Sequence, residues 1–407
     1  MIENVINFKG VKMINQTNVQ LGRKRSNIRE LFEYGKKRKA EIGEDKVFDF
    51  SIGNPSVPAP AEVETALKEI IQTYDPVALH GYTSAQGDFS VRKTLAEYIN
   101  SRFGTSLNAD CLYLTCGAAA SLTITLNALL NVGDEVITVA PYFPEYKVFT
   151  AHAGGKLVAV ESNDGTFQLD LNKVKAALSD KTKAVLINSP NNPSGVVYRE
   201  SDIKKLAQLL ENHYAETGVR VYLISDEPYR ELVFDKDTVV PYVMNYYAHS
   251  IVCYSYSKSL SLPGERIGYI AVNNQMQEFS EVYAGICGAG RALGFVCAPN
   301  LFQQLIGKVY NKTSDISIYK ANRDRLYSAL TEYGYTVVKP DGAFYLFVKA
   351  LEADAKTFSE RAKKYELLVV AGDDFGCEGY VRISYCVAPD MIERALPAFK
   401  ALAESYK

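Results

Sequence analysis

The sequence is poor in the residues that build disulfide frameworks and metal centres. It contains seven cysteines, an odd number, and none of them stands in a Cys-x-x-Cys pair. Scattered cysteines of this kind are typical of reduced thiols in a cytoplasm rather than of disulfides or a zinc site. The four histidines also stand singly. We therefore expect no metal site and a cytoplasmic location.

Neither sign of charge dominates the chain, and long apolar runs are lacking. The formal net charge is -2, so there is no basic field that would favour nucleic acid or an anionic membrane surface. No apolar run reaches the roughly 18 residues that a transmembrane helix needs, and the N-terminal residues have no long apolar core. We expect neither secretion nor membrane insertion. The 407 residues are enough for a large domain and a smaller one.

Short β-rich runs alternate with stretches of helical spacing, such as Asp202 to Tyr214. Runs made almost entirely of Val, Ile, Leu and Tyr are typical of strands covered on both faces. The pattern predicts an α/β fold whose large domain holds a mostly parallel seven-stranded sheet flanked by helices. The predicted strands are Cys111 to Cys116, Glu135 to Ala140, Lys156 to Val160, Ala184 to Asn188, Val221 to Ser225, Ile251 to Ser255 and Ile267 to Val272.

The pattern changes near residue 310 and predicts a second, smaller α+β domain. It consists of a helix from Tyr310 to Tyr333, then strands at Tyr335 to Lys339, Ala343 to Val348 and Val381 to Tyr385, then a final helix. Helical spacing also runs from Asn27 to Ile42. We predict an N-terminal arm and part of the small domain at 1–55, the large domain at 56–305 and the small C-terminal domain at 306–407.

One lysine, Lys258, lies just past a β-rich run and among small hydroxyl residues, with Arg266 farther along the same segment. A lysine buried at a strand end is costly to keep charged, so its pKa falls and its amine can condense with a carbonyl. Serines and an arginine are suitable ligands for a phosphate dianion. The combination indicates pyridoxal 5'-phosphate held as a Schiff base. The alternative is a surface loop with a solvated lysine.

A strand end followed by small residues occurs in the run Leu114-Thr-Cys-Gly-Ala-Ala-Ala-Ser121. Small side chains let backbone N–H groups at the start of a helix approach an anion, which the helix dipole also favours. Close packing of a helix on a sheet would use the same alanines. Taken alone, this run favours the packing explanation.

Three asparagines follow another predicted strand, in Asn188-Ser-Pro-Asn-Asn-Pro-Ser-Gly195. The prolines and the glycine indicate a tight turn, and Asn192 before Pro193 is pushed toward an extended conformation that projects its amide. Turn chemistry explains most of this composition. It leaves open whether an amide donor here meets a phenolic oxygen of a ligand.

A carboxylate ends the next predicted strand, in Ser225-Asp-Glu-Pro-Tyr-Arg230. Asp226 follows β-forming residues and should be buried, so it needs a cationic partner such as a pyridinium nitrogen. Tyr229 lies within reach of the same ligand. We expect Glu227 to be a surface acidic turn.

An arginine lies inside a β-rich run near the C-terminus, in Tyr380-Val-Arg-Ile-Ser384. Such an arginine is usually an edge residue or an ion-pair partner. Arg382 could instead bind a substrate carboxylate through two parallel hydrogen bonds.

Taken together, the motifs GAAA, PYF, NSPNNPSG, SDEPY, SYSKSLSLPGERIG and YVRIS resemble, in content and order, the class I/II aminotransferases of the aspartate aminotransferase superfamily, which have fold type I. The match runs from about Asp49 to Tyr385. The resemblance implies a homodimer with active sites shared across the interface. It also implies two-stage transfer of an amino group from an L-amino acid to a 2-oxo acid, with 2-oxoglutarate as the expected acceptor.

The resemblance also implies roles for individual residues toward pyridoxal phosphate. Lys258 would be the Schiff-base lysine and the base that moves the substrate proton, and Asp226 would keep the pyridine nitrogen protonated. Asn192 and Tyr229 would bond the phenolic oxygen. The expected phosphate ligands are Gly117, Ala118 and Ala119 through the backbone, Ser255 and Arg266.

Further implied contacts concern the ring, the substrate and the second subunit. Phe143 matches the ring that stacks on the cofactor, where the best-known aspartate aminotransferases have tryptophan. Tyr82 matches a tyrosine that reaches the phosphate of the neighbouring subunit. Gly53 matches a glycine near the substrate carboxylate, and Arg382 matches the arginine that binds it. Asn192 is expected to contact the substrate as well. Arg291 falls near the position where members specific for dicarboxylates supply an arginine to the partner's site, although a structural arginine fits the short match equally.

The donor and the reaction type stay open at this point. Aspartate-like, aromatic and alanine-like donors all fit the common motifs. A carbon–sulfur β-lyase on the same fold is an alternative, but lyases resembling this set often carry histidine where Asn191 stands. A non-catalytic aminotransferase-like binding protein is the other alternative, and its usual DNA-binding segment has no room in the short N-terminal stretch.

Overall fold

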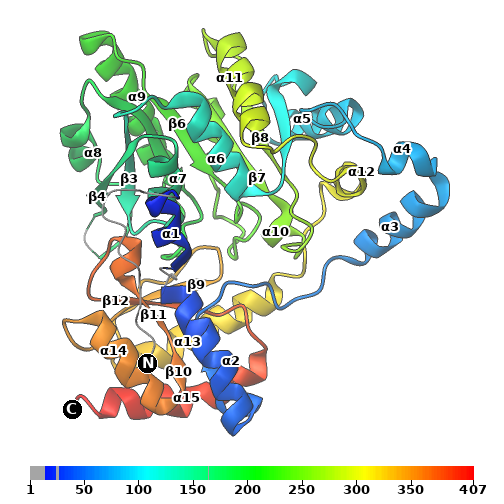
Figure 1. The fold of residues 1–407 in the computed structure, drawn as a ribbon. Helices are drawn as coiled ribbons and strands as arrows, with labels where there is room; N and C mark the ends of the chain where they lie inside the picture. The colour runs from blue at the N-terminus through cyan, green and yellow to red at the C-terminus, as the bar shows by residue number, and fades with distance from the viewer. Residues whose placement is uncertain (1–13, 24–26, 164) are drawn as a thin grey trace.

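A seven-stranded sheet forms the centre of the computed structural model, which describes residues 14–23, 27–163 and 165–407 (Figure 1). The strand order is β2-β8-β7-β6-β5-β3-β4. Only β8 runs antiparallel to its neighbours within this sheet. The predicted mostly parallel seven-stranded sheet is confirmed. The strands are β2 (Leu112–Thr115), β3 (Glu135–Ala140), β4 (Lys156–Glu161), β5 (Thr182–Asn188), β6 (Tyr222–Asp226), β7 (Ser250–Ser255) and β8 (Gly268–Val272).

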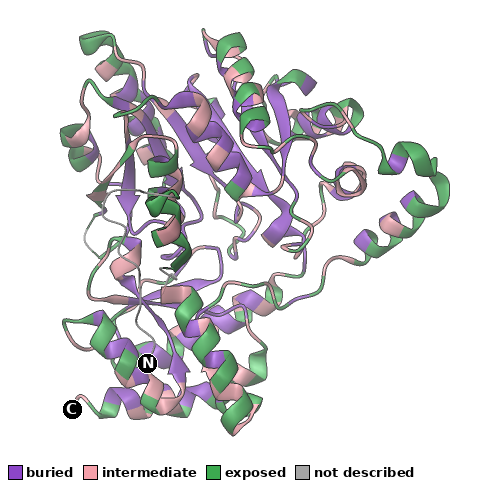
Figure 2. Cartoon of the chain, viewed as in Figure 1, coloured by how far each residue is buried: buried purple, intermediate pink, exposed green. Residues whose placement is uncertain are grey.

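Helices cover both faces of this sheet because successive strand residues point to opposite sides. Ile137 and Val185 join one apolar core, whereas Val136 and Ala184 join the other. Figure 2 shows the strands buried and the outer helix faces exposed. One core includes α3 (Ala61–Thr73), α5 (Phe89–Phe103), α8 (Leu171–Ala177), α9 (Glu200–Thr217) and α12 (Asn300–Val309), and the other includes α6 (Ala118–Leu129), α7 (Glu145–His152) and α11 (Phe279–Ala292).

A third apolar core lies below the large sheet in Figure 1 and joins residues around Phe50 to the C-terminal part of the chain. The N-terminal strand β1 (Phe48–Asp49) pairs with β10 (Leu367–Leu368), so Phe50 packs against Phe399. A three-stranded antiparallel sheet has the order β11-β12-β9. Its strands and the nearby helices are β9 (Tyr345–Lys349), β11 (Val370–Ala371), β12 (Tyr380–Ser384), α2 (Asn27–Ile42), α13 (Ser317–Tyr333), α14 (Ala355–Ala362) and α15 (Pro389–Glu404).

Two predictions for this part were wrong. The helix predicted from Tyr310 to Tyr333 begins only at Ser317, because Asp315 accepts a hydrogen bond from the Ser317 backbone N–H and Ser314 N–H donates to Ser259 O. The strand predicted from Tyr335 to Lys339 is reduced to a single bridge between Val337 and Val348. Pro340 follows directly and has no N–H with which to extend the pairing.

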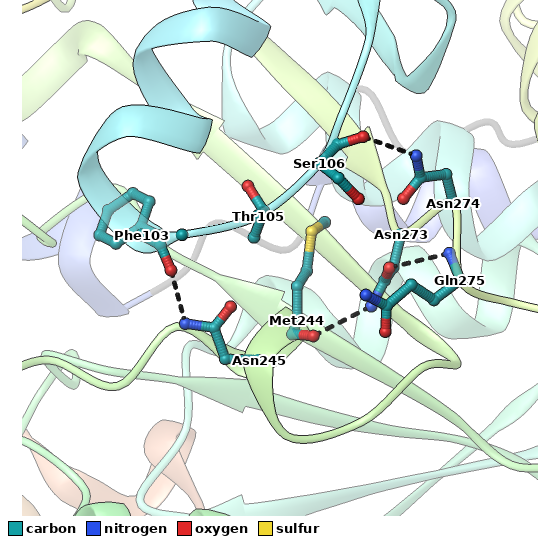
Figure 3. A pocket seen from close by; sticks show the side chains of 9 residues that line it. Phe103, Thr105, Ser106, Met244, Asn245, Asn273, Asn274 and Gln275 are labelled. Carbon is teal, nitrogen blue, oxygen red and sulfur yellow. Dashed lines mark hydrogen bonds between the residues drawn. The ribbon is translucent and has the colours of Figure 1, made fainter.

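The edge of the large sheet opposite the motifs carries a polar cavity of about 290 Å³. Figure 3 shows that its side-chain amides cross-link the surrounding loops. Asn245 Nδ2 donates to Phe103 O, and Asn274 Nδ2 donates to Ser106 O. Asn245 therefore ties the end of α5 to the segment before β7, and Asn274 ties the residues after α5 to the turn after β8. In the described part of the chain, no helix is both long and apolar enough to cross a membrane.

Candidate active site

The motifs found in the sequence meet at one edge of the large sheet. Strands β2, β3, β5, β6 and β7 all end there, because their pairings place them in the same direction. The strand register sets Asn188 beside Asp226. Since β8 is antiparallel, its first residue, Gly268, lies opposite Thr115 and Ser255. Arg266 is thereby brought to the same edge, where open α/β sheets bind ligands.

Lys258 lies on the short helix α10 (Tyr256–Ser259), which begins directly after β7. The Ser255 hydroxyl caps this helix by accepting from Ser257 N–H at 3.1 Å. The lysine Nζ donates to the Gly53 carbonyl at 2.6 Å and lies 5.4 Å from the centre of the Phe344 ring. Burial lowers the pKa of Lys258 to about 8. The neutral fraction of this amine near physiological pH is therefore larger than that of an exposed lysine.

Asp226 is the last residue of β6 and is only 4% exposed. Its Oδ2 accepts a hydrogen bond of 2.6 Å from the Tyr146 hydroxyl, whereas its buried Oδ1 has no partner. Burial raises the pKa of Asp226 to about 7. An unpartnered buried carboxylate oxygen is costly, so this site is prepared for a donor that a ligand supplies.

Glu227 is a correction to the sequence interpretation, which placed it in a surface turn. It is 1% exposed, and its Oε2 accepts from Arg230 Nε at 2.5 Å. Ser225 Oγ donates to its Oε1 at 2.8 Å. The buried charge is tolerated because a guanidinium three residues later folds back onto it.

In the asparagine loop at the end of β5, two side-chain amides stabilise the loop and the third faces the candidate site. Asn188 Nδ2 donates to Asp226 O at 2.8 Å, and its Oδ1 accepts from Asn192 N–H at 2.7 Å. Asn191 Oδ1 accepts from Ser194 N–H and Oγ, which closes the turn. The Asn192 side chain is left to face Arg382. Two of the three amides therefore hold the third in place.

Arg382 lies in β12 and is 2% exposed. Its Nη1 donates to Asn192 Oδ1 at 3.1 Å and its Nη2 to Ser51 O at 2.6 Å, while its buried Nε has no partner. The guanidinium also lies 4.7 Å from the Tyr345 ring centre and 5.0 Å from that of Phe375. The aromatic contacts fix the guanidinium, and none of the contacts named here is made by a carboxylate.

Tyr345 was not singled out from the sequence, yet it connects several expected site residues. Its hydroxyl lies 2.9 Å from that of Tyr229, and both tyrosines are buried. A Cβ added to Gly53 would overlap the Tyr345 hydroxyl and lie 2.9 Å from its Cζ. Burial raises the pKa of Tyr229 well above its ordinary value. A tyrosine within an apolar strand is usually predicted to be a core residue, so the sequence alone does not indicate this contact.

The small-residue run forms a close approach between backbone and arginine. Gly117 has φ 86° and precedes α6, whose first residues are Ala118 and Ala119. A Cβ on Gly117 would lie 2.9 Å from Arg266 Nη2. Arg266 Nη1 lies 3.5 Å from Ser257 Oγ, which in turn lies 2.6 Å from Ser255 Oγ. Ser257 thus joins the predicted phosphate ligands at the N-terminus of α6, where backbone N–H groups favour an anion.

The other predicted residues lie at or beyond the rim of this cluster. Phe143 is half-buried and contacts Tyr146 edge-on. Tyr82 lies between α4 (Pro76–His80) and α5 and is 99% exposed. Arg291 is exposed near the end of α11. The structure therefore does not bring Tyr82 and Arg291 together with Lys258 in one chain.

Comparison with known proteins finds aminotransferases along nearly the whole chain. An aspartate aminotransferase of Thermotoga maritima is 31% identical over 91% of this chain and 95% of its own. An aminotransferase structure from Eubacterium rectale shares 55% identity and a TM-score of 0.95, covering 98% of this chain and 100% of its own. The aspartate aminotransferase of Thermus thermophilus with maleate shares 25% identity and a TM-score of 0.84, with 96% and 100% covered. A family model, aminotransferase class I and II, matches residues 45–399, and the chain belongs to that family.

Proposed function

We propose that this aminotransferase moves an amino group from an aspartate-like or aromatic L-amino acid to 2-oxoglutarate in two half-reactions. The observation that carries the proposal is that the Lys258 amine and the buried Arg382 guanidinium both bind backbone carbonyls of the same three-residue segment, 51–53. Lys258 Nζ binds the carbonyl of Gly53, and Arg382 Nη2 binds that of Ser51. An amine for proton transfer and a cation for a carboxylate therefore face the same space.

The family depends on pyridoxal phosphate, and the residues at the sheet edge fit this cofactor. The partnerless Asp226 Oδ1 suits a pyridinium N–H. The Gly117 backbone and Arg266 approach each other closely enough to hold a phosphate between small residues. When bound, the cofactor supplies an aldehyde carbon for the amine and a cationic ring that withdraws electrons from the substrate Cα. We propose these cofactor contacts: Gly117, Ala118, Ala119, Phe143, Asn192, Asp226, Tyr229, Ser255, Lys258 and Arg266.

Lys258 Nζ would act as the base that removes the substrate Cα proton and returns it to the neighbouring carbon. The pKa of about 8 suits this work, because an amine titrating near neutral pH can both accept and donate the proton. The Tyr229 hydroxyl, held by Tyr345 at 2.9 Å, would bond the phenolic oxygen together with Asn192. Burial on this side excludes water from the proton that moves.

Arg382 would bind the α-carboxylate of both the amino acid and the oxo acid. Its fork is already oriented by Asn192 Oδ1 and by the two flanking rings. Gly53 would leave space beside the guanidinium, since a side chain there meets Tyr345. Two parallel N–H···O bonds to a carboxylate give both affinity and orientation.

An aspartate-like donor is favoured by what is known of similar proteins. The Thermotoga maritima relative is named an aspartate aminotransferase, and the Thermus thermophilus structure contains maleate, a dicarboxylate. An exposed Arg291 would be free to reach a distal carboxylate in a neighbouring subunit. An aromatic donor is the second candidate.

Purified protein should be tested with a panel of amino acids, using 2-oxoglutarate as acceptor. We expect the highest kcat/KM with aspartate, and loss of both the visible cofactor band and turnover in Lys258→Ala. Release of pyruvate from cysteine or cystathionine without an oxo acid would instead indicate a β-lyase. Bound cofactor without turnover on any amino acid would indicate a non-catalytic binding protein.

We also propose a homodimer in which Tyr82 reaches the partner's phosphate site. Three large apolar side chains at this end of the molecule, Val77, Tyr82 and Phe89, are 82%, 99% and 59% exposed. Such a grouping of exposed apolar residues is typical of an interface. Sedimentation at the mass of a single chain would contradict the proposal, as would unchanged cofactor affinity in Tyr82→Ala.

The domain boundaries and the location of the protein are proposals of the same kind. We propose an N-terminal arm and part of the small domain at 1–55, the large domain at 56–305 and the small C-terminal domain at 306–407. The separate apolar cores support this division, and Tyr229, Leu232 and Phe234 of the large domain also pack into the core of the small one. All seven cysteines are free thiols, which supports a reducing compartment such as the cytoplasm. Limited proteolysis and fractionation of cells would test these two statements.

A further inference from the structure

We propose that Tyr146 is a positioning residue that aims one oxygen of Asp226 at the cofactor and keeps that carboxylate charged, an inference that rests on the role proposed above for Asp226. Tyr146 belongs to α7, which starts after the Pro-Tyr-Phe-Pro run, and its side chain is 1% exposed. It lies on the covered side of the sheet edge and has no place among the residues proposed to touch substrate or cofactor.

The contact between the two side chains is short and leaves the carboxylate half satisfied. Tyr146 Oη donates to Asp226 Oδ2 at 2.6 Å, and Oδ1 stays buried without a partner. With Oδ2 fixed by the phenol, the carboxylate cannot rotate freely, so the lone pairs of Oδ1 keep one direction. That direction is available to the pyridine nitrogen, the donor that the cofactor would bring.

The same hydrogen bond selects the charge state. A phenol O–H stabilises a carboxylate more than it stabilises a carboxylic acid, because the charged oxygen is the stronger acceptor. Burial acts in the opposite direction and raises the pKa of Asp226. Glu227, buried next to Asp226, also opposes its ionisation. Without the phenol, the proton between Asp226 and the pyridine nitrogen would lie more on the carboxyl group and less on the ring nitrogen. A less protonated ring would withdraw fewer electrons from the substrate.

The contact differs from those of two other buried tyrosines, Tyr247 and Tyr335. Tyr247 Oη donates to Val221 O, directly before β6, and Tyr335 Oη donates to Phe399 O. Both hydroxyls satisfy backbone carbonyls, as is usual in a core. Tyr146 instead donates to a side chain whose second oxygen is unsatisfied. Its ring keeps its place through an edge contact with Phe143, with ring centres 5.7 Å apart at 84°, so a phenylalanine can replace it without a change of shape.

The test compares Tyr146→Phe with Tyr247→Phe and with Asp226→Ala. Tyr247→Phe is the control, because it removes a buried hydroxyl that bonds the other end of β6, at Val221 O. Pyridoxal phosphate is titrated into each cofactor-free protein, and the dissociation constant is taken from the visible absorption. We expect about tenfold weaker binding in Tyr146→Phe, since hydrogen bonds to charged groups are the stronger ones, and little change in Tyr247→Phe. With ¹⁵N-labelled pyridoxal phosphate, the ring nitrogen signal should move toward the unprotonated shift in Tyr146→Phe and in Asp226→Ala, but not in Tyr247→Phe.

Two outcomes separate failure of this inference from failure of the role of Asp226. If Asp226→Ala weakens cofactor binding and moves the ¹⁵N shift but Tyr146→Phe does neither, the phenol has no positioning role and the inference is overturned. If Asp226→Ala leaves both quantities unchanged, the role proposed for Asp226 is wrong. A loss of thermal stability that is equal in Tyr146→Phe and Tyr247→Phe, without the ¹⁵N change, would mark Tyr146 as a core residue.

Discussion

Removal of the Arg382 guanidinium gives a direct measure of carboxylate binding. In the complex, the fork would make two hydrogen bonds to the α-carboxylate. Each hydrogen bond to a charged group contributes about 1.5–3 kcal/mol, so Arg382→Ala should lose about 3–6 kcal/mol, which is roughly 10²- to 10⁴-fold in kcat/KM. Arg382→Lys keeps a charge but loses the fork, and we expect it to lose about half of that free energy.

The assay compares the best amino acid with the amine that lacks its α-carboxylate, both with 2-oxoglutarate. We expect wild-type protein to prefer the amino acid strongly, and Arg382→Ala to lose most of that preference while cofactor affinity changes little. Arg394→Ala is the matched control, because Arg394 is an exposed arginine of the same region, paired with Asp390 on α15. An unchanged KM for the amino acid in Arg382→Ala, or an equal loss for both substrates, would refute the assignment.

Two further predictions follow from the lysine and from the close contact at Gly53. The cofactor-free protein should capture pyridoxal phosphate faster as pH rises through about 8, because Lys258 must lose its proton to react. Burial also disfavours the charged amine in the folded protein, so between pH 8 and the ordinary lysine pKa the unfolded state binds more protons. The free energy of unfolding should therefore rise with pH in this range, by roughly 3 kcal/mol in total relative to Lys258→Met. Stopped-flow absorption measures the capture rate and urea unfolding at pH 7 and 10 measures the stability; a capture rate that does not change with pH would contradict the lowered pKa. Gly53→Ala should displace Tyr345, cost about 1–3 kcal/mol of stability and lower kcat/KM. The control is Gly264→Ala, because a Cβ added there has no atom within contact distance. Equal thermal unfolding and equal turnover of the two variants would rule out the contact between Gly53 and Tyr345.

The fold was largely predictable because the strands are apolar runs bounded by turn residues. Strands end where the polar motifs begin, so Asp226, the asparagine loop and Lys258 could be placed at one edge before any coordinates were known. The residues that escaped prediction belong to types that usually fill cores. Tyr146 and Tyr345 sit in apolar surroundings, and only their hydroxyl contacts show that they support the site.

Errors arose where a hydrogen-bond or ion-pair partner overrode the local sequence pattern. Glu227 reads as a surface residue because its neutralising partner, Arg230, lies beyond a proline in the same turn. The helix expected from Tyr310 is delayed because Ser314 N–H bonds to Ser259 O, a contact that spacing along the chain cannot reveal. The roles of Tyr82 and Arg291 stay predictions, since they concern a second subunit.

The two carbonyl oxygens that hold the active-site cations have a consequence for how this protein can evolve. Ser51 O and Gly53 O belong to the main chain, so every amino acid offers the same acceptor at these positions. Ile52, which is 39% exposed, can therefore be substituted without removing either acceptor. Gly53 is held to one identity by the neighbouring Tyr345, and Ser51 is buried with its hydroxyl bonded to Asp49. A library saturating residues 51–53 should return many tolerated variants at the middle codon and almost none at the last.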